Sequence, residues 1–186
     1  MAEDSEREKD REMLALAATL RAPLAKAGKL AASNGTGYVA AAVLTALCSL
    51  STALPDLVAL GVAAVLVFVG VQALRLGPRL RNGDADAGRA LARNELLLFA
   101  AISIYCLLMV TVVKPTSDEL DDALRAAGSK LDTAGLAKAV YAIVFAVTLL
   151  YQGGLARHFR KRAADAEAYV FEVPQWARDA VAGLPG

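Results

Sequence analysis

Four long runs of apolar residues, separated by charged segments, divide the chain. They cover residues 37–54, 55–74, 95–113 and 136–152, and they carry charge only at their ends. Each run is close to the roughly 20 residues that an α-helix needs to cross the hydrocarbon core of a bilayer. A helix on the surface of a water-soluble bundle would place charged residues along its outer face. The pattern therefore predicts four transmembrane helices.

The first two runs are almost continuous, and the break between them decides the fold. Pro55 suits the first turn of a new helix, where its missing N–H is not needed. A single helix through both runs would be about 57 Å long, far more than a bilayer accommodates. We therefore expect an all-α integral membrane four-helix bundle, made of two helical hairpins with flanking amphipathic helices.

Three segments outside the apolar runs have the spacing of amphipathic helices. The first precedes residue 37 and is interrupted at Pro23, where we expect a kink. The second lies in the loop between the third and fourth runs, where Thr116 and Glu119 have the spacing of a capping box. The third is a short helix from Trp176 to Leu184, after Pro174. These segments are the predicted flanking helices.

The distribution of basic residues predicts the orientation of the helices. Of the 20 Lys and Arg residues, 16 fall before the first run, between the second and third, or after the fourth, and the other 4 fall between the third and fourth or at the start of the fourth. The positive-inside rule places the larger group, and with it both termini, in the cytoplasm. The predicted organisation is a cytoplasmic amphipathic segment (1–36), a four-helix transmembrane domain (37–152) and a cytoplasmic basic and aromatic tail (153–186).

Composition and candidate ligands narrow the classes of function. A net charge of +1 gives no overall field that would attract nucleic acid. The single histidine, His158, lies in the basic segment after the fourth run, so the spans contain no pair of haem ligands. Cys48 and Cys106 lie inside apolar runs and are interpreted as small buried hydrophobic residues. Neither a GxSxG nor an HExxH motif occurs. We expect no cofactor, no metal and no catalytic centre.

One face of the first run and one basic segment are the candidate sites. Small residues recur every four positions on that face and favour close helix packing, either within the bundle, which we prefer, or against a partner chain. They are Ala41, Thr45, Ser49 and Ala53. The basic segment and a later aromatic residue are candidates for contact with lipid headgroups or a partner, although the charges also suit a role in setting topology. They are Arg157, Arg160, Lys161, Arg162 and Trp176.

The function expected from these features is that of a non-enzymatic multi-pass membrane protein. We interpret it as a structural or accessory subunit of a membrane assembly, in contact with membrane lipids and with other membrane chains or further copies of itself. The alternative is an oligomeric pore or a small transport protein. Glu95 and Lys138 lie at the ends of their runs, where a long side chain reaches water, and the spans offer no ionisable residue at depth for coupled transport. The Ala- and Arg-rich composition favours a bacterial inner membrane.

Overall fold

Short turns apart, the protein is helical throughout the part of the chain that the structure describes. The structure is a computed structural model, and it describes residues 2–50, 57–111, 126 and 133–182. These contain the helices α1 (Ala2–Leu50), α2 (Leu57–Arg81), α3 (Ala85–Thr111), α5 (Thr133–Glu172) and α6 (Gln175–Ala182). Four of them, α1, α2, α3 and α5, are long and apolar enough to span a membrane. The predicted all-α four-helix architecture is confirmed, whereas the helix expected from Thr116 lies outside the described residues.

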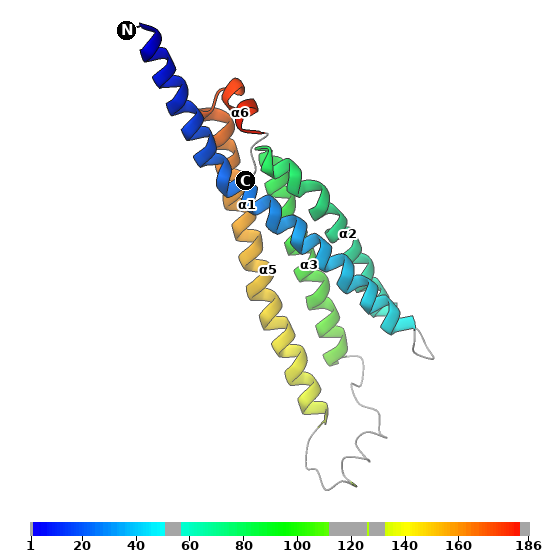
Figure 1. Cartoon of the computed structure of the whole chain (residues 1–186). Coiled ribbons are helices and arrows are strands. Elements are labelled where there is room, and N and C mark those ends of the chain that lie inside the picture. The colour runs from blue at the N-terminus through cyan, green and yellow to red at the C-terminus, as the bar shows by residue number, and fades with distance from the viewer. Residues whose placement is uncertain (1, 51–56, 112–125, 127–132, 183–186) are drawn as a thin grey trace.

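The helices form two pairs (Figure 1). The contacts between α1 and α2 are the most extensive, those between α3 and α5 come next, and α2 packs on α3 to join the pairs. Contacts between α1 and α5 are few, and the pairs move apart toward the ends of α1 and α5 that lie away from α6. The short helix α6 turns back against α1, which confirms a helix after Pro174.

The helices are longer than the apolar runs. α1 has 49 residues and α5 has 40, so both extend well past the predicted span ends at residues 37 and 152. The interruption predicted at Pro23 is wrong, because α1 continues through this residue. A proline inside a helix costs about 3 kcal/mol. Buried side chains on both sides of it, including Ala17 and Leu24, hold the two parts of α1 in the core and offset this cost.

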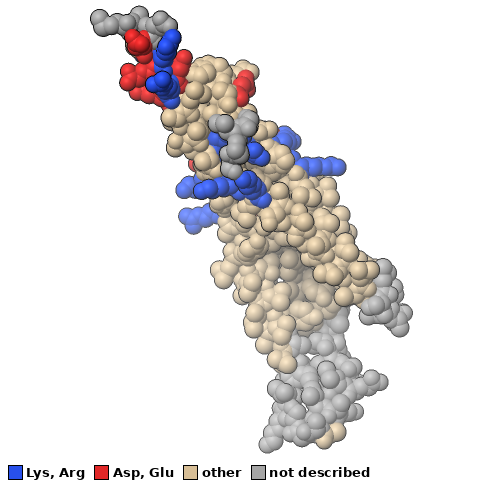
Figure 2. Space-filling model, in the orientation of Figure 1, with Lys and Arg blue, Asp and Glu red and all other residues tan. Residues whose placement is uncertain are grey.

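The molecule has a charged half and an apolar half. The charged half comprises α1 up to residue 36, α2 from 75, α3 up to 93, α5 from 153, and α6. The other parts of the helices form the apolar half. On the face seen in Figure 2, the Lys and Arg side chains gather toward the end with the N-terminus. The larger buried cluster lies mostly in the charged half and includes Leu24, Leu80, Leu91 and Phe159. A smaller cluster around Val69 packs part of the apolar half.

A tight turn joins α2 to α3 at the charged end. Gly83 adopts a φ of +88°, a left-handed conformation that glycine accepts without strain. Asp84 then caps α3: its Oδ1 accepts a hydrogen bond of 3.1 Å from the backbone N–H of Ala87, and its Oδ2 accepts one of 2.9 Å from Nε of Arg79. Burial alone would raise the pKa of Asp84, but these two donors outweigh it and lower the pKa.

The cap predicts a pH-dependent contribution to stability. We expect Asp84→Ala to lower the free energy of unfolding by about 1 kcal/mol at neutral pH, since the cap is lost. Because the folded-state pKa of Asp84 is lowered, the charge contributes fully above the unfolded pKa of about 3.9, and this contribution is lost as the pH falls through the lower folded-state pKa. The measurement is unfolding in detergent at pH 7 and pH 3. Asp84→Asn, which still caps, is the control and should lose less at pH 7 than Asp84→Ala does. Equal losses for the two variants would refute the cap.

Candidate functional site: a buried polar cluster between three helices

Three polar side chains meet inside the bundle where the charged and apolar halves join. They are Tyr38 on α1, Glu95 on α3 and Gln152 on α5. Glu95 is only 1% exposed and Gln152 only 4%, and Tyr38 is half-buried. Glu95 follows the buried core residues Leu91 and Ala92 along α3. The expectation that its carboxylate reaches water from the end of a span is therefore wrong.

The hydroxyl group of Tyr38 links the other two side chains. It donates to Oε2 of Glu95 at 2.8 Å and lies 3.3 Å from Oε1 of Gln152. Within the described residues, no Lys or Arg forms an ion pair with Glu95. A phenol has one proton to donate and can also accept, whereas a carboxyl group donates only when it is protonated. The three groups can thus stay hydrogen-bonded in more than one arrangement of protons.

A second, more exposed contact joins α1 to α5 beside this cluster. The hydroxyl of Tyr151 donates to Oδ1 of Asn34 at 3.3 Å, one helical turn from Tyr38. The side-chain nitrogens of Asn34 and Asn94 are buried without a hydrogen-bond partner among the described residues. Buried polar atoms without partners are uncommon and destabilising. Asn94 directly precedes Glu95 in α3 and Asn34 lies one turn before Tyr38 in α1, so buried polar atoms flank the cluster along both helices.

The sequence contained a signal for this cluster that the prediction did not use. Tyr38 comes at the start of the first apolar run, Glu95 at the start of the third, and Gln152 at the end of the fourth. In the predicted topology, these three positions lie on the same side of the membrane. An ionisable residue inside a membrane bundle marks a functional site by default, often a proton or ion pathway. Tyr38 was missed because a tyrosine at a span end is also typical of interfacial anchoring.

Close packing of α1 on α2 depends on glycine. A Cβ atom added to Gly28 would lie 2.6 Å from the carbonyl oxygen of Gly77, and one added to Gly35 would lie 2.8 Å from that of Gly70. In the same way, a Cβ atom added to Gly77 would lie 2.8 Å from the carbonyl oxygen of Gly28, and one added to Gly70 would lie 2.8 Å from that of Gly35. The contacts Gly28–Gly77 and Gly35–Gly70 are seven residues apart on each helix. The residue numbers rise along α1 where they fall along α2, as expected for two antiparallel helices. This seam fixes the register of α1 on α2.

The residues of the small-residue face predicted on the first run differ in how deeply they are buried. Ala41 is exposed, Thr45 is half-buried, Ser49 is 6% exposed, and Ala53 lies outside the described residues. The hydroxyls of Thr45 and Ser49 donate to the carbonyl oxygens of Ala41 and Thr45, both at 2.9 Å. These bonds stay within α1, so the role of this face in packing remains a prediction.

The predicted contact residues of the tail spread over several faces of α5 and α6. Arg157, Arg160 and Lys161 are exposed, and Trp176 on α6 is 47% exposed. Arg162 is half-buried and pairs with Asp165 at 2.5 Å. His158 is half-buried against Phe159, with ring centroids 5.7 Å apart, and its pKa is lowered by burial and by the charge of Arg162.

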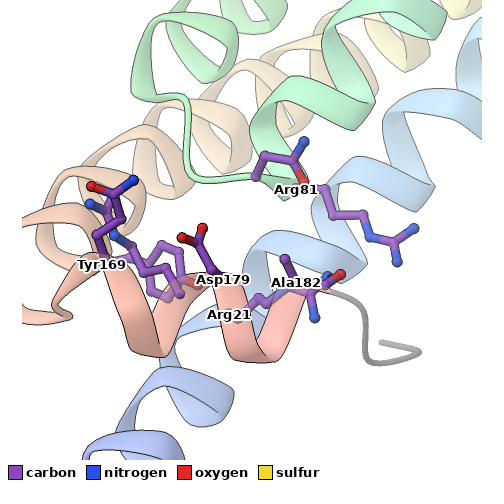
Figure 3. A pocket seen from close by; sticks show the side chains of 8 residues that line it. Arg21, Arg81, Tyr169, Asp179 and Ala182 are labelled. Carbon is purple, nitrogen blue, oxygen red and sulfur yellow. The ribbon is translucent and has the colours of Figure 1, made fainter.

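An arginine from α1 holds α6 in place. Arg21 is 6% exposed, and its guanidinium donates to the carbonyl oxygens of Val181 and Ala182 at the end of α6. Figure 3 shows Arg21 beside Ala182, next to a cavity of about 460 Å³ that Tyr169 and Asp179 also line. Carbonyls at the end of a helix have no partner within the helix, so a buried cation is a favourable cap.

The architecture defines an α-helical multi-pass membrane protein with four candidate membrane spans. Its helices continue outside the apolar region as a packed, charged bundle. No protein-family model matches the chain, and neither a curated protein nor a solved structure matches it.

Proposed function

We propose that this multi-pass protein is a non-enzymatic structural or accessory subunit of a membrane assembly, which works through helix contacts and its cytoplasmic surface. The observation that supports this is an exposed apolar corner, with two aromatic side chains, where α5 ends and α6 begins. Phe171 is 92% exposed, Trp176 47% and Val170 44%. Phe171 is 19 residues beyond Gln152, which is about 28 Å along a helix. Such a position is in water rather than lipid, where exposed aromatic residues are typical of protein contacts.

Photocrosslinking tests the corner directly. Phe171 is replaced by p-benzoylphenylalanine in cells that express the full chain, and membranes are irradiated. We expect a discrete crosslinked species, which is either a second copy or another chain. The matched control position is Leu16, 37% exposed on α1 in the same half of the molecule. Crosslinking that is equally weak, or equally diffuse, at both positions would reject the corner as a contact site.

The proposed orientation has both termini in the cytoplasm of a bacterial inner membrane. Reporter fusions at Pro78, Asp122 and Gly186 should report cytoplasm, outside and cytoplasm respectively, because the basic residues are concentrated on one side. A cytoplasmic signal at Asp122 would contradict the arrangement of the third and fourth spans.

The second candidate function, a small oligomeric transport protein, is favoured by one observation, the buried carboxyl group of Glu95. We expect the purified protein in liposomes to show no proton or ion flux above protein-free controls, at either sign of membrane potential, because one chain offers no continuous polar path across about 30 Å of hydrocarbon. Proton flux that is lost in Glu95→Gln and kept in Tyr151→Phe would favour transport instead. Flux that changes with Thr45→Leu or Ser49→Leu would favour an oligomeric pore.

A further inference from the structure

A cavity of about 330 Å³ lies on the seam between α3 and α5, at the edge of the charged half. Its lining consists of Arg89, Arg93, Arg160, Ala163, Ala164 and Glu167. The helices approach each other closely beside it, since a Cβ atom added to Gly88 would lie 3.0 Å from that of Ala163. Because the lining residues between the charged side chains are alanines, no large side chain fills the space between the arginines.

Two of the three arginines have no acidic partner among the described residues. Arg89 is engaged by Asp86 at 3.0 Å and by Glu167 on α5. Arg93 and Arg160 are exposed and form no ion pair within the described residues. The cavity therefore presents two guanidinium groups, one from each helix. Guanidinium groups bind phosphate oxygens through paired, charge-assisted hydrogen bonds.

The cavity lies where the apolar half begins. Arg93 is two residues before Glu95, the first residue of the third apolar run. Arg160 is eight residues after Gln152, the last residue of the fourth run, and α3 and α5 run antiparallel. In the membrane, this boundary is the level of lipid headgroups.

An exposed apolar strip continues from the cavity along the same seam. With about 100° per residue, Leu97, Ala100 and Ile104 follow Arg93 on one face of α3, and Gly153 and Leu149 follow Arg160 on one face of α5. Leu97 is 45% exposed, Ile104 59% and Leu149 46%. A Cβ atom added to Gly153 would meet no atom within 4 Å, so the strip is open beside it.

We propose that this seam binds one anionic phospholipid of the surrounding bilayer. Its phosphodiester lies between Arg93 and Arg160, and an acyl chain lies along Leu97, Ile104 and Leu149. A soluble phosphate would need only the two guanidinium groups, whereas the apolar strip in line with them suits a ligand that has both a phosphate and a chain. The site depends on the membrane location of the chain and not on its role as an accessory subunit.

The test uses the delipidated full chain in a non-ionic detergent, titrated with phosphatidylglycerol and with phosphatidylcholine of the same acyl chains, and followed by native mass spectrometry. We expect one phosphatidylglycerol per chain at saturation and markedly weaker binding of phosphatidylcholine. The double variant Arg93→Gln/Arg160→Gln should bind phosphatidylglycerol roughly 30-fold more weakly, because each basic contact contributes about fivefold. The matched control is Lys26→Gln/Arg75→Gln, which removes two exposed positive charges from the α1–α2 side and should change binding less than threefold.

Two outcomes would overturn the proposal. An equal loss of binding in both double variants would mean that phosphatidylglycerol responds to overall charge and not to this cavity. Glycerophosphoglycerol, the same headgroup without acyl chains, separates a lipid site from a site for soluble phosphate esters. We expect it not to displace the lipid at concentrations up to tenfold above that of the lipid. Displacement at equal concentration would assign the cavity to a soluble anion.

Discussion

Gly35→Ala and Gly70→Ala should each destabilise the protein by about 1–3 kcal/mol, although alanine is normally the better helix former. The added Cβ atom would lie 2.8 Å from a backbone carbonyl oxygen of the facing helix in both cases. A backbone atom cannot rotate away as the end of a side chain can, so α1 and α2 must separate. Gly28→Ala and Gly77→Ala should behave in the same way, since their added atoms would approach the facing carbonyls to 2.6 and 2.8 Å.

The same two helices provide the controls. Gly37 on α1 and Gly61 on α2 have no atom within 4 Å of an added Cβ. Gly37→Ala and Gly61→Ala should therefore stabilise the protein by about 0.5–1 kcal/mol, through the ordinary helix preference of alanine. The measurement is reversible unfolding in mixed micelles, with all six variants compared at one detergent composition. Changes of the same sign for contact and control positions would refute the glycine seam.

Tyr38→Phe should destabilise the protein by about 1–3 kcal/mol, because Glu95 loses the hydroxyl that hydrogen-bonds its buried carboxyl group. Glu95→Leu alone leaves the Tyr38 hydroxyl hydrogen-bonded only to Gln152 and should destabilise the protein less. When both polar partners are removed together, the cost of an unpaired buried group falls. The double variant Tyr38→Phe/Glu95→Leu should therefore be more stable than the sum of the single effects predicts.

The double-mutant cycle gives the coupling energy between Tyr38 and Glu95, which we expect to exceed 0.5 kcal/mol. Tyr151→Phe is the matched control, since it removes a tyrosine hydroxyl from a 3.3 Å contact at an exposed position. Its effect should stay within about 0.5 kcal/mol, the range of surface substitutions. Strictly additive effects at Tyr38 and Glu95 would mean that their hydrogen bond contributes nothing to the stability of the bundle.

The sequence predicted the parts of the fold that depend on solvent, and much less of the parts that depend on packing. The apolar runs give four spans because lipid contact requires nearly continuous apolar sequence. That criterion stops at the first charged residues, so it missed the continuation of α5 to Glu172. The amphipathic helix expected before residue 37 was predicted from its spacing, but not that it is continuous with the first span in α1. Outside the membrane a helix needs only one apolar stripe, and Leu24 and Phe159 belong to such stripes.

The pattern of residues along one helix does not show which other helix packs against it. The regular spacing of Ala41, Thr45 and Ser49 identifies small residues on one face, but it cannot say which face meets α2. The contacts at Gly35 and Gly70 depend on the register of two helices, which neither helix encodes alone. Glu95 was interpreted as a terminal, hydrated residue because its depth depends on Tyr38 and Gln152 on two other helices.

The central claim, that the protein works as a subunit of an assembly, is tested most directly by the mass of the complex extracted from membranes in mild detergent. The chain alone has a mass of 19.4 kDa. We predict a defined larger complex for the wild type, which falls to the single-chain mass in Phe171→Ser/Trp176→Ser and persists in Leu16→Ser/Leu30→Ser, where both replaced residues are 37% exposed. A wild-type mass of one chain under every extraction condition, with no stoichiometric second component, would contradict the account.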